Sequence, residues 1–224
     1  MKRFFNHKLF TQKNVINFSS RKSLICIFFL IAIIAPQQVL AKTDFLITHK
    51  TDLEAVESYL NSIKNFSAKF IQKSSNGTVE GKFYLSRPGK MRVEYLNEPK
   101  ILIVVNGSVL SYKDIELDEI SNLSTNTTPA SFLTRANISF AAKDVEITNV
   151  IKNNESITIS LIKKNRTEAG EFTLIFKTHP ALGFAKMQVT NDLGEVTSIT
   201  LNNATFPESL SDNLFVIRNK NLPF

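Results

Sequence analysis

One stretch, residues 81–110, constrains the fold more than any other part of the chain. Its sequence, GKFYLSRPGKMRVEYLNEPKILIVVNGSVL, alternates apolar and polar side chains at a period of two. Such alternation is typical of strands with one apolar face and one solvated face. The stretch therefore predicts consecutive strands joined by hairpins. The apolar face carries Gly81, Phe83, Leu85, Met91, Val93 and Tyr95.

The turns within this stretch fit the same pattern. Ser86-Arg87-Pro88-Gly89 has a proline and a glycine in the order that a type II turn favours. Asn106-Gly107 suits a two-residue hairpin. Residues 101–105 are apolar on both faces, which predicts a strand that is covered on both sides.

A helix is predicted from Thr51 to Lys64, where apolar residues recur at spacings of three and four. Thr51 and Glu54 have the spacing of a capping box, which predicts the start of the helix. We expect this helix to cover the sheet, either as fixed packing or as a movable lid. Its apolar face carries Leu53, Val56, Leu60 and Ile63.

A second, short helix is predicted after Thr128, which can serve as its cap. Pro129 would occupy the first helical position, where a missing N–H costs nothing. Phe132 and Leu133 would be its apolar residues. We expect this helix also to lie over the sheet.

Alternating segments fill most of the remaining chain, and short turn sequences separate them. About eleven strands joined mainly by hairpins predict a strongly curved antiparallel sheet or a barrel. No internal repeat or low-complexity linker divides residues 42–224, so we expect one mostly β domain of the α+β class. The further expected strands are 66–73, 109–113, 115–121, 145–152, 155–163, 171–178, 183–190, 195–202 and 212–217.

The amino-terminal segment, residues 1–41, has the pattern of a cleaved secretory signal peptide. Leu24–Ala35 is uncharged and follows Arg21-Lys22, and Val39-Leu40-Ala41 offers a cleavage site after Ala41. The segment fits a membrane anchor less well, because a spanning helix needs about 20 apolar residues and this run has 12. A transit peptide is a second alternative, which the solid apolar run disfavours. We therefore expect the protein to be exported.

The leader also changes what charge and cysteine content imply. The net charge of +7 includes six basic residues and no acidic residue within residues 1–41. The remainder has 21 basic and 20 acidic residues, so nothing indicates nucleic-acid binding. The single cysteine, Cys26, lies in the leader, which excludes disulfides, thiol catalysis and lipidation of the mature chain.

Residues that could carry catalysis or hold a metal are sparse. His49 and His179 are not at metal-ligand spacing with another donor. Nucleophile-elbow, phosphate-loop and dinucleotide-binding motifs are absent from the sequence. We therefore expect neither an enzyme nor a cofactor, although these absences do not exclude an exported enzyme.

The order of these features resembles the periplasmic outer-membrane lipoprotein carrier proteins, the LolA family. The resemblance covers nearly the whole of residues 42–224 and is most specific at Arg87-Pro88, ahead of an alternating strand, followed by Asn106-Gly107. The chain has no tryptophan, and Phe83 and Val93 stand where an aromatic such as tryptophan is frequent in the family. The resemblance implies an incomplete antiparallel β-barrel whose apolar concave face is covered by helices.

The resemblance also implies a function without catalysis. Such carriers bind the acyl chains of lipoproteins that an inner-membrane ABC transporter releases, and deliver them to an outer-membrane acceptor. Arg87 is expected to act as the latch of the lid, by its match to the family's arginine before proline; an exposed arginine beside a turn is the alternative. We expect a monomer. The expected acyl-chain cavity is lined by Phe66, Phe70, Phe83, Leu85, Met91, Val93, Tyr95 and Ile103.

Alternatives to the carrier remain open at this point. From residue types alone, the apolar stripe is more often a filled core than a ligand cavity. A related periplasmic domain that senses or accepts lipids or lipoproteins would share the fold. Binding of acylated peptide separates the first two functions from an enzyme, and transfer of cargo separates a carrier from a sensor.

Overall fold

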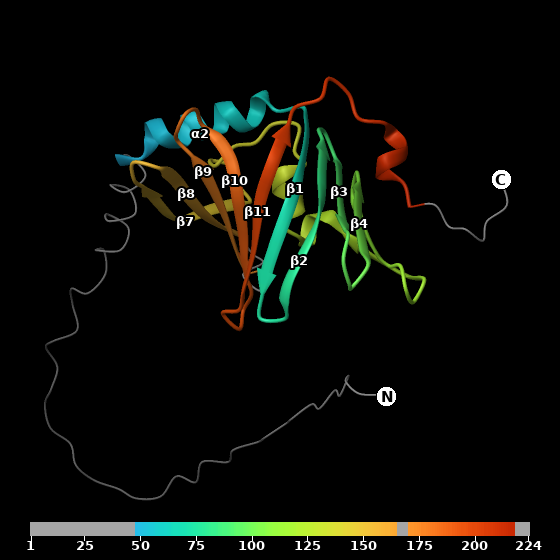
Figure 1. Cartoon of the computed structure of the whole chain (residues 1–224). Helices are drawn as coiled ribbons and strands as arrows, with labels where there is room; N and C mark the ends of the chain where they lie inside the picture. The colour runs from blue at the N-terminus through green and yellow to red at the C-terminus, as the bar shows by residue number, and fades with distance from the viewer. Residues whose placement is uncertain (1–47, 165–169, 218–224) are drawn as a thin grey trace, which may run out of the picture. The chain divides into compact units, whose positions relative to one another are not determined.

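The computed structural model describes residues 48–164 and 170–217 (Figure 1). The expected signal peptide, residues 1–41, lies outside the described residues, so cleavage after Ala41 remains a prediction. In the described part of the chain, no helix has the length and apolar character that crossing a membrane would require.

An open, antiparallel sheet of eleven strands dominates the described residues, in the order β6-β5-β4-β3-β2-β1-β11-β10-β9-β8-β7. This confirms the predicted incomplete barrel, because β6 and β7 stand at opposite ends of the order. Strands that are paired in the sheet are consecutive in sequence, except for β1 and β11. The strands are β1 (Asn65–Ser74), β2 (Gly77–Ser86), β3 (Lys90–Tyr95), β4 (Ile101–Asn106), β5 (Val109–Asp114), β6 (Glu119–Ser124), β7 (Val145–Lys152), β8 (Ser156–Lys163), β9 (Glu171–Lys177), β10 (Gly183–Thr190) and β11 (Val196–Thr205).

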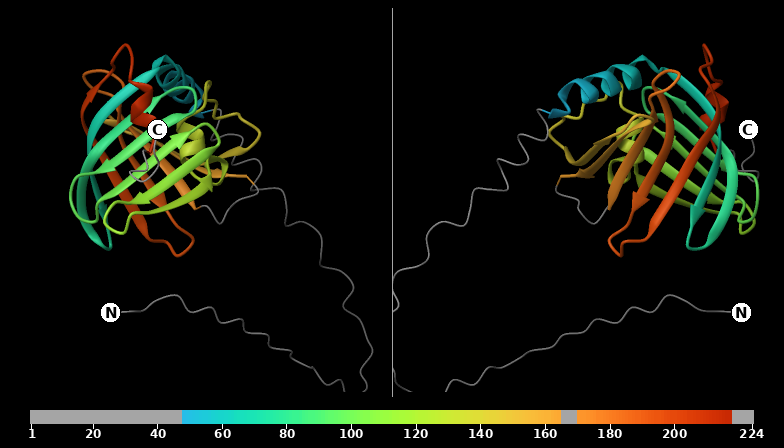
Figure 2. Two further views of the ribbon diagram at one scale, coloured as in Figure 1. Left: turned by 90° about the vertical axis from the view of Figure 1, so that its right-hand side faces the viewer. Right: turned by 60° about the vertical axis from the view of Figure 1, so that its left-hand side comes forward.

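The sheet is strongly curved, as the two views in Figure 2 show, and we call the space on its concave side the hollow. Irregular registers interrupt three strand pairs: Ser67/Lys69 in β1, Phe184/Lys186 in β10 and Ile147/Asn149 in β7. An extra residue in one strand of a pair bends that strand and increases the local twist. These irregularities therefore help the long sheet to curl.

The concave side of the sheet holds the main core, and three short helical elements cover it. They are α2 (Lys50–Ser62), η1 (Thr125–Thr127) and α3 (Ala130–Leu133). Helix α2 lies across one end of the hollow, with Leu53, Val56 and Leu60 buried, and α3 lies inside the curl (Figure 1). Both predicted helices exist, and both pack on the apolar face of the sheet.

The start of each helix differs from the prediction. Helix α2 begins at Lys50 with His49 at its N-cap and no side-chain cap, so the expected capping box is wrong. Thr51 is already inside the helix. Before α3, the Thr128 hydroxyl donates backward to the Thr125 carbonyl at 2.9 Å, and Pro129 is the N-cap.

Strand β4 is covered on both faces, as predicted. Val105 is fully buried on the concave side, whereas Leu102 and Val104 pack with Phe215 on the convex side. Phe215 belongs to η3 (Asp212–Phe215), where the sequence predicted a last strand; that prediction is wrong. A short apolar run does not distinguish a strand from a helical turn by its periodicity.

One local prediction beside a hairpin also needs correction. The strand expected over 115–121 begins only at Glu119, because the Asp114 carboxylate accepts hydrogen bonds from the backbone N–H groups of Glu116 and Leu117 and holds a turn there. At the turn after β2, Gly89 has the expected positive φ, of 79°.

Candidate functional site

A cavity of about 210 Å³ lies between the concave face of the sheet and α3. It receives side chains from strands β1 to β5, from strands β9 to β11 and from the segment 128–133, so it occupies the middle of the hollow. Nearly every lining side chain is apolar. The lining residues are Phe70, Phe83, Met91, Val93, Ile103, Leu110, Thr128, Pro129, Ala130, Leu133, Phe172, Met187, Val189 and Ile199.

The structure brings five of the eight expected cavity residues together on this lining: Phe70, Phe83, Met91, Val93 and Ile103. The other three, Phe66, Leu85 and Tyr95, lie beside the cavity and do not line it in this closed arrangement.

Phe66 is buried in an aromatic cluster, with its ring centre 6.0 Å from that of Phe83 and 6.2 Å from that of Phe184. Leu85 is buried in the same core. The Tyr95 hydroxyl donates to the Gln72 side-chain oxygen at 2.7 Å. Desolvation raises the pKa of Tyr95, so its hydroxyl stays protonated at neutral pH.

The far wall of the cavity was not predicted from the sequence. It consists of Leu110 on β5, Phe172 on β9, Met187 and Val189 on β10, and Ile199 on β11. These strands do alternate, so the apolar face of each was visible. Leu110 reaches the cavity through the β4–β5 hairpin, whereas the approach of β9, β10 and β11 to residues 70–103 depends on the pairing of β1 with β11, which joins distant parts of the sequence.

The absence of a side chain at Gly81 shapes the cavity at Phe70. A Cβ at Gly81 would lie 2.3 Å from the Phe70 ring and 2.3 Å from the Glu94 carbonyl oxygen, far inside contact distance. The ring can therefore lie against the backbone of β2, where it also packs edge-on against Tyr95 at 5.5 Å between centres. Any side chain at Gly81 would displace Phe70 from this position.

The volume of the cavity indicates a closed state. Apolar cavities of roughly 150 Å³ stay dry and admit small aromatic molecules, whereas typical ligand sites measure about 300–1,000 Å³. At about 210 Å³, this cavity lies between the two. The hollow is therefore partly empty, and a ligand with long hydrocarbon chains would fit only if the covering helices moved.

Arg87 joins the two covering helices. Its Nε donates to the Leu133 carbonyl of α3 at 2.8 Å, and its Nη1 donates to the carbonyls of Leu60 and Ile63 at the end of α2, the latter at 3.3 Å. The neighbouring backbone also contributes, because the N–H of Gly89 donates to the Thr134 carbonyl at 2.7 Å. The turn after β2 therefore contacts both helices.

Arg87 has both favourable and unfavourable electrostatic contributions in its present position. Its guanidinium faces the carbonyl end of α2, where the helix dipole favours a cation. No carboxylate of the described residues lies within ion-pair distance of it, and its Nη2 is buried without a hydrogen-bond partner among them. Burial lowers the pKa of Arg87 to about 10, so it stays charged at neutral pH. Movement of the two helices away from Arg87 would break its three hydrogen bonds, but it would also let water hydrate the guanidinium.

Helix α2 has further polar contacts with the loop that follows α3. The Asn61 side chain both donates to the Ile138 carbonyl at 2.9 Å and accepts from the Ile138 N–H at 2.7 Å. Glu57, one turn earlier, accepts from the Phe140 N–H. Helix α2 is therefore joined to residues 138–140 as well as to Arg87.

The expected lid residues are all buried. The four on the α2 side are Leu53, Val56, Leu60 and Ile63, and they belong to the main core. On α3, Leu133 lines the cavity, whereas Phe132 points to the other side and stacks on Phe140 at 5.7 Å. The two apolar residues of α3 therefore face different spaces.

The sheet is open and strongly curved, and two helices that Arg87 joins cover an apolar cavity on its concave side. This is the architecture of a half-barrel protein with space for an apolar ligand. Residues 61–218 match the family model described as outer membrane lipoprotein carrier protein LolA, which covers more than half of the chain. The chain belongs to this family.

Relatives with a similar sequence are distant. An outer-membrane lipoprotein carrier protein of Pseudoalteromonas translucida is 27% identical over 177 residues, which cover 73% of this chain and 81% of the relative. An uncharacterised protein of Rickettsia prowazekii is 26% identical over 168 residues, which cover 75% of this chain and 76% of the relative. Among solved structures, a LolA superfamily protein of Nitrosomonas europaea is 12% identical, with a TM-score of 0.43 over 74% of this chain and 97% of that one.

Proposed function

We propose that this protein is a periplasmic carrier that encloses the acyl chains of lipoproteins and moves them from the inner to the outer membrane. The observation that carries this proposal is the apolar cavity beneath two helices that one half-buried arginine joins to each other. Family membership agrees with it. Export would depend on residues 1–41 acting as the signal peptide, with residues 42–224 as the mature domain.

The energetics explain why such cargo needs a cavity. Each methylene group removed from water contributes about 0.8 kcal/mol, so one long acyl chain represents on the order of 10 kcal/mol. A lipoprotein that diffused freely would expose its acyl chains to water and would lack this stabilisation. Residues such as Phe70, Met91 and Ile103 offer the apolar surface that replaces contact with water.

The closed cavity is smaller than this cargo, so loading requires the helices to move apart. Every contact that stabilises the closed, empty form opposes cargo binding, because the cargo binds only the open form. The cargo can shift the equilibrium between the two forms only by the difference in its affinity for them. Arg87 is the residue we assign to this competition. In this scheme an inner-membrane ABC transporter loads the open form, and an outer-membrane acceptor takes the cargo as the lid closes.

Displacement of a bound fluorescent probe tests the proposal. The uncharged dye N-phenylnaphthylamine is expected to enter the cavity, and a triacylated lipopeptide should displace it whereas the same peptide without acyl chains should not. Equal displacement by both peptides, or by neither, would contradict acyl binding.

Transfer then separates a carrier from a lipid sensor. Protein loaded with radiolabelled lipoprotein is mixed with outer-membrane vesicles, and the label is followed into the vesicle pellet. A carrier releases its cargo there, and less so to inner-membrane vesicles. Cargo that binds but remains with the protein in both cases would contradict carriage and favour a sensor.

A further inference from the structure

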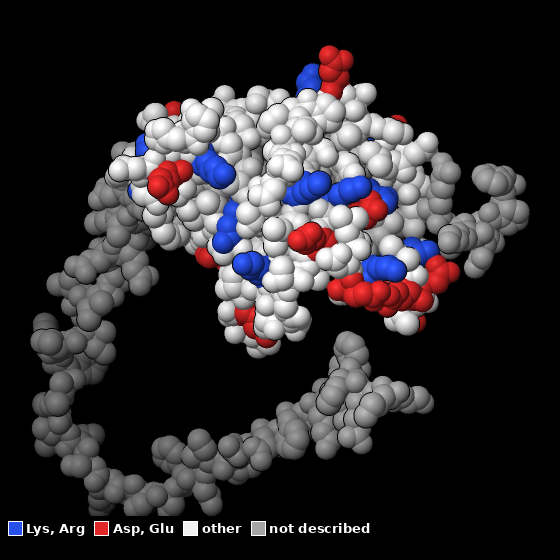
Figure 3. All heavy atoms as spheres, viewed as in Figure 1, with Lys and Arg blue, Asp and Glu red and all other residues white. Residues whose placement is uncertain are grey.

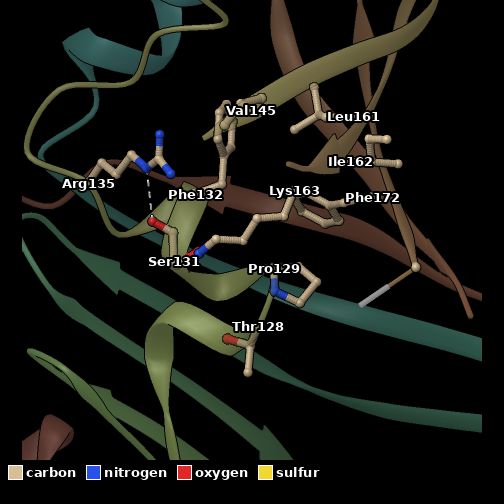
Figure 4. Close-up of a pocket in the computed structure, with 11 residues that line it drawn as sticks. Thr128, Pro129, Ser131, Phe132, Arg135, Val145, Leu161, Ile162, Lys163 and Phe172 are labelled. Carbon is tan, nitrogen blue, oxygen red and sulfur yellow. Dashed lines mark hydrogen bonds between the residues drawn. The ribbon is translucent and has the colours of Figure 1, made fainter. Parts of the chain in front are cut away.

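A second, smaller pocket lies on the other side of α3, between that helix and strands β7 to β9 (Figure 4). Its volume is about 40 Å³. Phe132, Val145 and Phe172 form much of its apolar wall. Unlike the main cavity, it is also lined by two cationic side chains, Arg135 and Lys163, and both extend toward Ser131 in Figure 4.

The two spaces share a thin wall. Thr128, Pro129 and Phe172 line both the main cavity and the second pocket. A single layer of residues therefore separates them, and part of that layer is the segment that leads into α3. Because Arg87 joins α3 to α2, release of α3 would move this wall and connect the two spaces.

The charges beside the second pocket are unequal. Arg135 pairs with Asp144 through Nη2 at 2.5 Å, and its guanidinium lies over the Phe132 ring at 5.4 Å. Lys163 donates to the Asn126 carbonyl, which uses one of its three N–H donors. Among the described residues in these contacts, two cations thus share one carboxylate.

The titration of Asp144 reflects this excess of positive charge. Burial alone would raise its pKa, but the hydrogen bond and charge of Arg135 and the charge of Lys163 together keep the pKa of Asp144 below its usual value. Both cations therefore act on the same carboxylate.

We propose that the second pocket is an anion subsite, which binds the carboxylate or phosphate group of a single-chain lipid whose hydrocarbon tail passes the Thr128–Pro129 wall into the main cavity. The ligand class is a free fatty acid or an anionic single-chain phospholipid. Lys163 contacts the anionic head group directly. Arg135 adds positive charge, and its ion pair with Asp144 holds the Arg135 side chain in place. The inference rests on the proposed function in that the cavity must accept an acyl chain.

The experiment compares ligands that share one tail and differ in the head. Laurate, dodecyl phosphate and the uncharged dodecanol each displace N-phenylnaphthylamine from the full chain below their micelle-forming concentrations. We expect both anions to bind about tenfold more tightly than dodecanol, since only a charged head group can accept a charge-assisted hydrogen bond from Lys163. The tighter anion of the two identifies the natural head group.

A matched pair of variants locates the effect. Lys163→Gln removes the charge beside the pocket, whereas Lys186→Gln removes a charge from the opposite, convex face, because its neighbour Met187 points into the cavity. Lys163→Gln should remove most of the preference for anions and leave dodecanol binding unchanged. Lys186→Gln should change neither. Thermal unfolding of both variants checks that the fold is retained.

The possible outcomes distinguish this inference from the proposed function. If dodecanol and the anions bind equally, or if Lys163→Gln and Lys186→Gln behave alike, the anion subsite is wrong while acyl binding stands. If none of the three ligands displaces the dye, acyl binding itself fails. A preference for anions that Lys163→Gln alone abolishes supports the subsite.

Discussion

At the scale of single residues, Arg87 carries the most specific expectation. The residues from Ser86 to Gly89 predict a turn, and only the resemblance to the carrier family assigned the arginine to a latch. In the structure the guanidinium contacts carbonyls of both α2 and α3, and the role of a latch stays a prediction. Which carbonyls it meets depends on the tertiary packing of two helices, and no local pattern encodes that.

Replacing Arg87 with leucine should alter lid opening more than folding. The change removes hydrogen bonds from a charged group, worth about 1.5–3 kcal/mol each, but also removes the cost of a half-buried charge. The empty closed form then competes less with cargo, so acylated-peptide affinity should rise about tenfold and transfer to outer-membrane vesicles should slow. Probe displacement and the vesicle assay measure the two effects.

Arg92→Leu is the matched control, because Arg92 lies on the convex face and donates to the Leu214 carbonyl of η3 at 3.0 Å. It should leave cargo affinity and transfer unchanged. Normal release by Arg87→Leu, or an equal defect in both variants, would show that Arg87 is not a latch.

At the scale of elements, the sequence predicted the existence of helices and strands better than their ends. Periodicity identified α2 and the hairpins, because one buried face of each is set by the sheet. The capping box at Thr51 and Glu54 failed, since the helix already begins at Lys50. The last strand failed as well, because Phe215 is buried against β4 through a helical turn.

The polar contacts of α2 lead to a second prediction, at Asn61. Asn61→Ala would leave both the N–H and the carbonyl of the buried Ile138 without their present partners. Unpaired buried groups cost about 1–3 kcal/mol each, so the free energy of unfolding should fall by about 2–3 kcal/mol. Urea denaturation measures this, and hydrogen exchange at the Ile138 amide should accelerate.

Glu54→Ala serves as the control, because Glu54 is an exposed residue of the same helix. Its effect on unfolding should stay within about 0.5 kcal/mol. Equal losses in the two variants would mean that α2 is not held through residues 138–140.

At the scale of the whole molecule, the closed hollow is the feature that sequence could not supply. Residues such as Phe70 and Ile103 could equally have belonged to a filled core. Whether space remains depends on the curl of the sheet and on the wall contributed by Met187 and Ile199, which arrives through pairing between the first and last strands. Acidic side chains gather at one corner of the convex face, over the β3–β4 and β5–β6 hairpin tips (Figure 3), away from this space.

The absence of tryptophan from the chain allows the hollow to be probed directly. Val93→Trp places one indole on the cavity lining, and lipopeptide carrying brominated acyl chains should quench its fluorescence by contact, whereas the unbrominated lipopeptide should not. Ile71→Trp is the control, since alternation from Phe70 puts residue 71 on the convex face. Quenching that is equal at both positions, or absent from position 93, would contradict cargo binding in the hollow.

Because Arg87 binds the two helices only through peptide carbonyls, these contacts should depend little on pH and salt concentration. Acidification neutralises carboxylates near pH ~4 and thereby weakens most ion pairs. Peptide carbonyls do not titrate in that range, and a guanidinium with a pKa of about 10 keeps its proton throughout it. Salt also screens buried contacts far less than exposed ones. The hydrogen bonds of Arg87 to the two helices should therefore persist in acid and at high salt, whereas an ion pair with a carboxylate would weaken under both conditions.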